Sequence, residues 1–340
     1  MIVVMARETS TDDLQAIRER IESRGLVAQI NLGVERTVIG VMGSIPPDFK
    51  DEMELMNGVV EVVMISKPYK LASKEFHPDD TIIKVGDAVI GGSAPVIMAG
   101  PCSVEDEEQM VSTAKAVKAA GATVMRGGAF KPRTSPYSFR GMGEDGLKLL
   151  LTAKQETGLP IITEVMATDD VETVAKYADI LQIGARNMQN YNLLDEVGKL
   201  DKPVMVKRGL AASYEEWLLA AEYVMAGGNQ QVILCERGIR GFETFTRFTL
   251  DVAAVPVIKR LSHLPIVCDP SHSTGKWYLV TPVALASIAA GAHGLIVEVH
   301  PNPDLAKCDG PQSLTFENFD MLMEQVKAIA SVRKQPVGTN

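Results

Sequence analysis

The sequence predicts an α/β protein in which a (β/α)₈ barrel follows a small α+β domain. Eight short apolar runs recur from residue 96 onward, and segments with helical periodicity separate them. The runs span residues 96–104, 123–128, 160–165, 180–185, 203–209, 232–238, 265–272 and 294–300. Eight strands that alternate with helices over about 240 residues are typical of a closed parallel barrel. An open doubly wound sheet is the alternative, but the chain has no G-x-G-x-x-G motif near its start.

Residues 1–66 form a pattern of their own. We expect strands at residues 2–5, 27–32, 36–42 and 59–65, and helices at about 11–24 and 46–56. The order βαββαβ is that of the split-βαβ, ferredoxin-like fold. A unit of this size is marginally stable alone, so we expect it to pack on the rest of the chain or on another subunit. It is either an accessory packing domain or a small-molecule sensor.

Residues 67–94 connect this domain to the barrel. Residues 81–90, with Gly86-Asp87 as a turn, predict a hairpin that caps the bottom of the barrel. We therefore divide the chain into a ferredoxin-like domain at 1–66, a linker with a capping hairpin at 67–94, and the barrel at 95–335.

Composition and charge narrow the class of protein. The formal net charge of −9 argues against nucleic-acid binding. No apolar run reaches the roughly 18 residues of a membrane span, and no signal peptide is recognisable at the N-terminus. The 4 cysteines are widely spaced and show no disulfide framework. These features predict a cytoplasmic protein.

The loop after the second barrel run is basic and rich in Gly and Pro. It contains Arg126, Lys131 and Arg133, and it continues to Thr134 and Ser135. Glycines at 127 and 128 would let the backbone approach a ligand closely. Arg offers bidentate donors to phosphate and carboxylate, and Lys a point charge. The loop either grips an anionic substrate or is a solvated basic loop.

Charged side chains also end the other predicted barrel strands, where barrels of this kind carry their active sites. The first, seventh and eighth strands are neighbours in a closed barrel, and they would bring together Cys102, His272, Glu298 and Asp309. A thiol, an imidazole and two carboxylates suit a divalent metal with Zn-, Mn- or Fe-like preferences. The opposite side would hold an anion pocket lined by Arg126, Lys131, Arg186, Lys207 and Arg237. Glu164 ends the third strand.

Each of these residues has a structural alternative. A lone Cys102 is more often a small buried hydrophobic residue, as we expect for Cys235 and Cys268. Cys308 stays undecided. His293 is expected to be structural, whereas His300 is either a metal ligand or a supporting group.

The motifs at these strand ends resemble the 3-deoxy-D-arabino-heptulosonate 7-phosphate (DAHP) synthase family. They are Ala99–Ser103, Arg126–Ser135, Ile183–Arg186, Lys207–Gly209, Cys235–Gly238, Asp269–Ser273 and Ile296–His300. The N-terminal module looks like the regulatory domain of the type I beta subgroup. The resemblance implies a metal-dependent aldol-type condensation of phosphoenolpyruvate (PEP) with erythrose 4-phosphate. This reaction is the first step of the shikimate pathway toward chorismate and the aromatic amino acids.

The resemblance also implies roles for residues. One divalent ion per subunit (Mn, Fe, Zn, Co or Cu) would be held by Cys102, His272, Glu298 and Asp309. PEP would be held by Arg126, Lys131, Arg186, Lys207 and Arg237, and the sugar phosphate by Arg133, Thr134 and Ser135. Two further roles are hypotheses from physical reasoning rather than from the resemblance: Lys131, with a pKa lowered by cationic neighbours, would protonate the new alkoxide, and Glu164 would position water.

Regulation and assembly follow from the same resemblance. Tyrosine or phenylalanine would bind between paired N-terminal domains, and the subunits would form a homotetramer. Gln29 and Asn31 would either hydrogen-bond a phenol or merely face water.

Three rival functions stay open. The first is 3-deoxy-octulosonate 8-phosphate synthase, which uses arabinose 5-phosphate and whose loop resembles K-A-N-R-S-S. The second is a class I aldolase with Lys207 as the Schiff base. The third is a non-catalytic small-molecule-binding barrel, which would be expected to lack some of the four metal residues.

Overall fold

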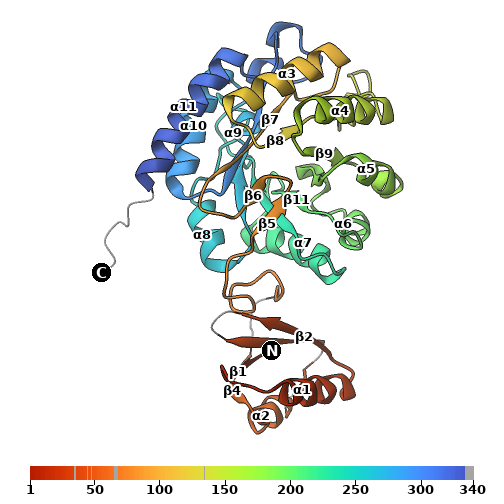
Figure 1. The fold of residues 1–340 in the computed structure, drawn as a ribbon, viewed down its shortest axis with the longest axis vertical. Coiled ribbons are helices and arrows are strands. Elements are labelled where there is room, and N and C mark those ends of the chain that lie inside the picture. The colour runs from red at the N-terminus through yellow and green to blue at the C-terminus, as the bar shows by residue number, and fades with distance from the viewer. Residues whose placement is uncertain (34–35, 44, 47, 65–67, 134, 334–340) are drawn as a thin grey trace. The chain divides into compact units, whose positions relative to one another are not determined.

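The computed structural model describes residues 1–33, 36–43, 45–46, 48–64, 68–133 and 135–333 (Figure 1). The chain divides into two compact units. The first comprises residues 1–80 with 260–263, and the second comprises residues 81–259 with the chain from 264 onward. The domain bounds predicted from the sequence stay predictions.

The first unit contains the predicted βαββαβ order. Its elements are β1 (Ile2–Met5), α1 (Thr11–Ser23), β2 (Val27–Leu32), β3 (Thr37–Met42), α2 (Phe49–Glu54) and β4 (Val59–Val63). The four strands form an antiparallel sheet in the order β2-β3-β1-β4. Ser10 caps α1 by accepting a hydrogen bond from the Asp13 backbone N–H. The second helix begins at Phe49 rather than at Pro46. Residues 47 and 65, which fell in a predicted helix and strand, lie outside the described residues.

Both faces of this sheet are covered within the first unit. Helices α1 and α2 bury Ile21 and Phe49 against one face. A Cβ atom on Gly40, which points to the other face, would lie 2.0 Å from the Phe76 ring. The Asn31 amide also donates to the Phe76 carbonyl at 3.3 Å. Part of the predicted linker therefore belongs to the core of the small domain.

The second unit is a closed barrel of eight parallel strands, which confirms the predicted fold class. Its strands are β7 (Val96–Gly100), β8 (Val124–Arg126), β9 (Ile161–Val165), β10 (Ile180–Ile183), β11 (Val204–Lys207), β12 (Val232–Glu236), β13 (Ile266–Cys268) and β14 (Gly294–Glu298). Strand β14 pairs with β7, which closes the barrel.

Helices follow the strands and surround them (Figure 1). They are α3 (Glu107–Ala120), α4 (Glu144–Thr157), α5 (Val171–Tyr177), α6 (Tyr191–Gly198), α7 (Tyr214–Ala226), α8 (Ala254–Leu261), α9 (Pro270–Thr274), α10 (Trp277–Ala290) and α11 (Phe316–Arg333). Short 3₁₀ turns lie at η1 (Thr168–Asp170), η2 (Ala185–Asn187), η3 (Pro303–Leu305) and η4 (Gly310–Gln312). Among the described residues, no helix is both long and apolar enough to span a membrane.

The predicted hairpin closes one end of the barrel. Strands β5 (Ile83–Val85) and β6 (Ala88–Ile90) pair, and their buried side chains join the cluster that fills the barrel interior. Gly86 and Gly91 lie against Pro160 and Pro265, which precede β9 and β13. The hairpin therefore covers the amino ends of the strands, and the carboxyl ends are left for a functional site.

The seventh predicted strand, at 265–272, is wrong in its second half. Strand β13 ends at Cys268, and α9 begins at Pro270. Asp269 is the N-cap of this helix, since its side chain accepts from the His272 N–H, and Pro270 occupies the first helical position. His272 therefore lies on a short helix rather than on a strand.

Candidate active site

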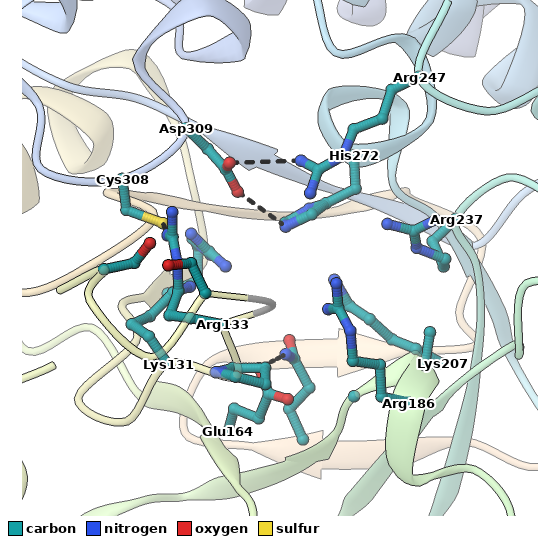
Figure 2. A pocket seen from close by; sticks show the side chains of 17 residues that line it. Lys131, Arg133, Glu164, Arg186, Lys207, Arg237, Arg247, His272, Cys308 and Asp309 are labelled. Atoms are coloured by element: carbon teal, nitrogen blue, oxygen red, sulfur yellow. Dashed lines mark hydrogen bonds and ion pairs between the residues drawn. The ribbon is translucent and has the colours of Figure 1, made fainter. Parts of the chain in front are cut away.

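A cavity of about 250 Å³ lies at the carboxyl ends of the barrel strands (Figure 2). Its wall is strongly cationic. The cations that line it are Arg126, Lys131, Arg133, Arg186, Lys207, Arg237 and Arg247. Glu164, Asp309, His272, Ser135 and Cys308 also line it, whereas Thr134 lies outside the described residues. The cavity is thus lined by all of the cations that the sequence assigned to an anion pocket.

Four potential metal ligands converge at one side of this cavity. One donor atom from each of Cys102, His272, Glu298 and Asp309 lies within 4.8 Å of the others. A thiolate, an imidazole and two carboxylates are a donor set that fits a borderline divalent cation. The structure therefore brings together the four residues that the sequence grouped.

Asp269 orients the imidazole of His272. Its Oδ2 atom lies 2.8 Å from His272 Nδ1 and 2.5 Å from Lys207 Nζ. Burial alone would raise the pKa of Asp269, but His272 and Lys207 hold it well below its usual range. Because Nδ1 is held by this carboxylate, Nε2 is directed toward Glu298 and Asp309, at 3.3 and 3.8 Å. Sequence reasoning noted Asp269 only as part of a motif.

Arg126 connects the cationic wall to the metal ligands. Its Nη1 atom donates to Glu298 Oε1 at 3.1 Å and to the Pro101 carbonyl at 2.6 Å. Burial would raise the pKa of Glu298, but His272 and Arg126 lower it below its usual value. The predicted division of the site into a cationic half and a metal-binding half is therefore too sharp. Arg126 ends β8 and Glu298 ends β14, and both strands pair with β7.

The predicted lowering of the Lys131 pKa is wrong. Lys131 Nζ is buried and donates to the Cys102 carbonyl at 2.9 Å. Burial alone would lower the pKa of this ammonium, but nearby Cys102, Cys308 and Glu298 raise it above its ordinary value, against an opposing effect of Arg126. The cationic neighbours are outweighed because the groups of opposite sign lie on the same wall.

Glycines shape the basic loop by close approach within the chain. A Cβ atom on Gly128 would lie 2.7 Å from the Cys102 carbonyl and 2.8 Å from Lys131 Cδ. A Cβ atom on Gly127 would lie 2.8 Å from Leu150 Cδ2. These glycines therefore allow the loop to close onto its own surroundings, rather than onto a ligand as the sequence suggested.

Cys308, which sequence reasoning left undecided, lies beside the metal ligands. Its Sγ atom is 3.1 Å from Cys102 Sγ and accepts from the guanidinium of Arg133. The hydrogen bond from Cys102 lowers the pKa of the Cys308 thiol, whereas burial raises that of Cys102. Cys308 thereby joins the basic loop to the metal cluster.

The far wall holds Glu164 and two arginines. Gln182 donates to Glu164 at 3.4 Å, and a Cβ atom on Gly184 would lie 2.0 Å from Glu164 Oε1. Arg237 stacks on the Phe248 ring at 4.3 Å, and burial lowers its pKa. Within the described residues, no carboxylate forms an ion pair with Arg186 or Arg237, so their charges are open to an anionic ligand.

Other polar residues near the strand ends serve the fold. Arg208 lies 2.9 Å from carboxylates of both Glu236 and Asp251 and does not line the cavity. His300 Nδ1 accepts from the Asn302 N–H at 3.1 Å, and His300 is not one of the four convergent ligands. His293, Cys235 and Cys268 are buried, as expected for structural residues.

Two side chains near the ligands were missed. Arg247 lies on the long connection from β12 to α8 and forms an ion pair with Asp309, and Gln312 donates to Glu298. Loops at the carboxyl end of a barrel carry functional residues, and this is the signal that could have directed attention to Arg247. Gln312 follows Asp309 at a distance of three residues, without a recognisable pattern.

Fold and site together define a (β/α)₈-barrel protein that can hold a divalent metal beside a pocket for anionic substrates. The chain belongs to the DAHP synthetase I family, whose family model matches residues 72–334. Residues 1–67 match the DAHP synthase ferredoxin-like domain. The predicted family and the predicted ferredoxin-like fold of the N-terminal domain are both confirmed.

Individual relatives agree with this assignment. The chain is 51% identical to a phospho-2-dehydro-3-deoxyheptonate aldolase of Thermotoga maritima, over 97% of this chain and 98% of the relative. A crystal structure of a Thermotoga maritima DAHP synthase matches with a TM-score of 0.78 and 50% identity, over 97% of both chains. A 2-dehydro-3-deoxyphosphooctonate aldolase of Magnetococcus marinus is 32% identical, over 74% of this chain and 94% of the relative.

Proposed function

We propose that this chain condenses PEP with erythrose 4-phosphate to give DAHP and phosphate. The observation that carries the proposal is the single cavity in which seven cations adjoin four convergent metal ligands. PEP brings a carboxylate and a phosphate, and the sugar brings a second phosphate, so the substrates carry the negative charge that such a wall neutralises. The identity of 51% to the Thermotoga maritima aldolase supports the same reaction.

Cys102, His272, Glu298 and Asp309 would hold one divalent ion, which is Mn, Fe, Zn, Co or Cu. Such an ion supplies Lewis acidity at the aldehyde oxygen of erythrose 4-phosphate. Asp269 contributes by holding the His272 ring in the orientation that a metal ligand needs.

PEP would lie against Arg126, Lys131, Arg186, Lys207 and Arg237. The buried guanidinium of Arg237 supports this placement, because a buried charge without a carboxylate partner favours an anionic ligand. Fixed cations would also hold the two substrates in an orientation suited to attack of the enol carbon on the aldehyde. The sugar phosphate would bind Arg133, Thr134 and Ser135, of which Arg133 and Ser135 line the cavity.

Two residues would handle protons and water. Lys131 is our candidate donor to the new alkoxide, and its raised pKa keeps the ammonium protonated before the reaction. Glu164 would position the water that attacks the cationic C2 of the intermediate. Gln182 supports this role because its amide donates to the Glu164 carboxylate.

The test follows the loss of PEP by its ultraviolet absorbance. The protein is stripped of metal with EDTA and assayed with and without restored Mn²⁺, with erythrose 4-phosphate or arabinose 5-phosphate as the second substrate. We expect Mn²⁺-dependent loss with erythrose 4-phosphate alone. No loss with either sugar in folded, Mn²⁺-loaded protein would contradict the proposal.

Loss of PEP only with arabinose 5-phosphate would favour the octulosonate reaction, which the relatives at 30–32% identity suggest as the second candidate. A Schiff-base aldolase is disfavoured because Lys207 is ion-paired with Asp269. Inactivation of the protein by borohydride in the presence of substrate would support the Schiff-base mechanism instead.

We also propose that tyrosine or phenylalanine inhibits the enzyme through the N-terminal domain, in a cytoplasmic homotetramer. The match of residues 1–67 to the DAHP synthase ferredoxin-like domain supports a role for this unit beyond packing. Rates measured with each amino acid, together with the mass in solution, test both points. Rates unchanged by either amino acid would exclude the effector.

A further inference from the structure

Asp309 has an unusual backbone conformation. Its φ of +52° makes it the one non-glycine residue with positive φ in the described part of the chain. A non-glycine residue in this left-handed region is strained, and the conformation persists only where the surroundings hold it. The Gln312 N–H and the Ser313 hydroxyl both donate to the Asp309 carbonyl at 3.2 Å. These contacts hold the Asp309 backbone in its strained conformation, and this conformation fixes the position of the Asp309 carboxylate.

Arg247 holds one oxygen of that carboxylate. Its Nη1 atom lies 3.3 Å from Asp309 Oδ1 (Figure 2). The other oxygen, Oδ2, lies 3.4 Å from Cys102 Sγ and 3.8 Å from His272 Nε2. One oxygen of Asp309 thus faces the arginine, and the other faces the centre of the ligand cluster.

Gln312 holds one oxygen of the Glu298 carboxylate, as Arg247 holds one oxygen of Asp309. Its side chain is buried, and its Nε2 atom donates to Glu298 Oε2 at 2.6 Å. Its Oε1 atom accepts from Arg247 at 3.0 Å. Glu298 Oε1 faces His272 Nε2 at 3.3 Å, and it also accepts from Arg126 at 3.1 Å. An amide suits this position because it offers an acceptor to the guanidinium and a donor to the carboxylate at the same time.

We propose that Arg247 and Gln312 form a brace that makes each metal carboxylate present a single oxygen to the ion. This inference rests on the proposed metal site. A carboxylate whose second oxygen is already bonded does not readily bind a metal through both oxygens. The brace therefore favours ions that accept few ligands at fixed angles, and it disfavours Ca²⁺, which takes 6–8 oxygens and often binds carboxylates through both. Arg247 and Gln312 are positioning residues for the reaction.

Arg247 could instead bind a substrate phosphate, because it lines the cavity. Gln312 separates the two roles, since it is buried and does not line the cavity. Gln312→Met keeps the length of the side chain but can neither donate to Glu298 nor accept from Arg247. Arg247→Met removes the other half of the brace, and Arg240→Met removes an exposed arginine from the same connection as a control.

The experiment measures Mn²⁺ affinity directly, by electron paramagnetic resonance of the free ion, in the full chain stripped of metal. We expect Gln312→Met and Arg247→Met each to weaken Mn²⁺ binding by about 10- to 100-fold. The double variant should lose little more than one single variant, because both act through one chain of contacts. Arg240→Met should bind Mn²⁺ like the parent protein. The Co²⁺ absorption spectrum should also change in both brace variants.

Substrate binding completes the test. PEP affinity of the metal-free protein, measured by calorimetry, should not change in Gln312→Met. Normal Mn²⁺ affinity in folded Gln312→Met protein, with Mn²⁺ bound by the parent, would overturn the brace alone. Failure of the parent to bind Mn²⁺ would overturn the metal site and the brace together. If Gln312→Met does not fold, Gln312→Asn shortens the amide and is read in the same way.

Discussion

The ion pair of Lys207 with Asp269 gives the sharpest prediction, through the substitution Asp269→Asn. Asp269 is 1% exposed, and its carboxylate contacts both Lys207 Nζ and His272 Nδ1. Asparagine is as good an N-cap as aspartate, so the hydrogen bond from the His272 N–H survives. The substitution therefore removes the charge and leaves the helix cap in place.

The magnitude follows from leaving Lys207 buried without a carboxylate. Removing one partner of a buried pair costs about 3–5 kcal/mol of unfolding free energy. Loss of the group that orients His272 should also weaken Mn²⁺ binding by about 10- to 100-fold. The pKa of Asp269 lies well below its usual range. The stabilisation by its charge is thus complete above the unfolded pKa of about 4, and it is lost as the pH falls through the lower folded pKa.

The assay is urea unfolding of the metal-free protein, followed by tryptophan fluorescence. Both tryptophans, Trp217 and Trp277, lie in the barrel unit, so the signal reports that unit. The difference between parent and Asp269→Asn should be present above about pH 4 and should shrink as the pH falls further. Asp304→Asn, the same change at an exposed site, is the control. A destabilisation below about 1 kcal/mol, or unchanged Mn²⁺ affinity, would refute the reasoning.

Three further predictions concern other parts of the chain. Burial lowers the pKa of His263 to about 4, so the folded state stays unprotonated there while the unfolded state binds a proton below about 6.5. Stability should fall by up to about 3 kcal/mol between pH 6.5 and pH 4, and His263→Gln should flatten this dependence in urea unfolding at several pH values. Peroxide should join the Cys102 and Cys308 sulfurs, 3.1 Å apart, with loss of two hydrogens by mass spectrometry; Cys308→Ser should not show this. Gly184→Ala should displace Glu164 and lower kcat/KM by about 100-fold while Mn²⁺ affinity is kept; an unchanged kcat/KM would exclude a role for the position of that carboxylate.

Local sequence patterns predicted most of the architecture. Apolar runs and helical periodicity report local burial, so eight strands, a capping hairpin and the βαββαβ order could all be inferred. The predicted barrel in turn placed the four metal residues together, because the carboxyl ends of the strands converge in any closed parallel barrel. His272 was grouped correctly although its strand was extended too far, since the helix that carries it is only five residues long.

The chain by itself thus determined most of the residues that reach the cavity, although not Arg247, and the tertiary structure decided what each of them contacts there. Lys131 illustrates the difference, because its neighbours in sequence are cations but thiols and a carboxylate from distant parts of the chain raise its pKa. The bonds of Asp269, Arg247 and Gln312 likewise depend on the paths of three separate connections above the barrel. Periodicity carries no information about such contacts, because electrostatic and hydrogen-bonding energies depend on distances of a few ångströms that only the folded chain sets.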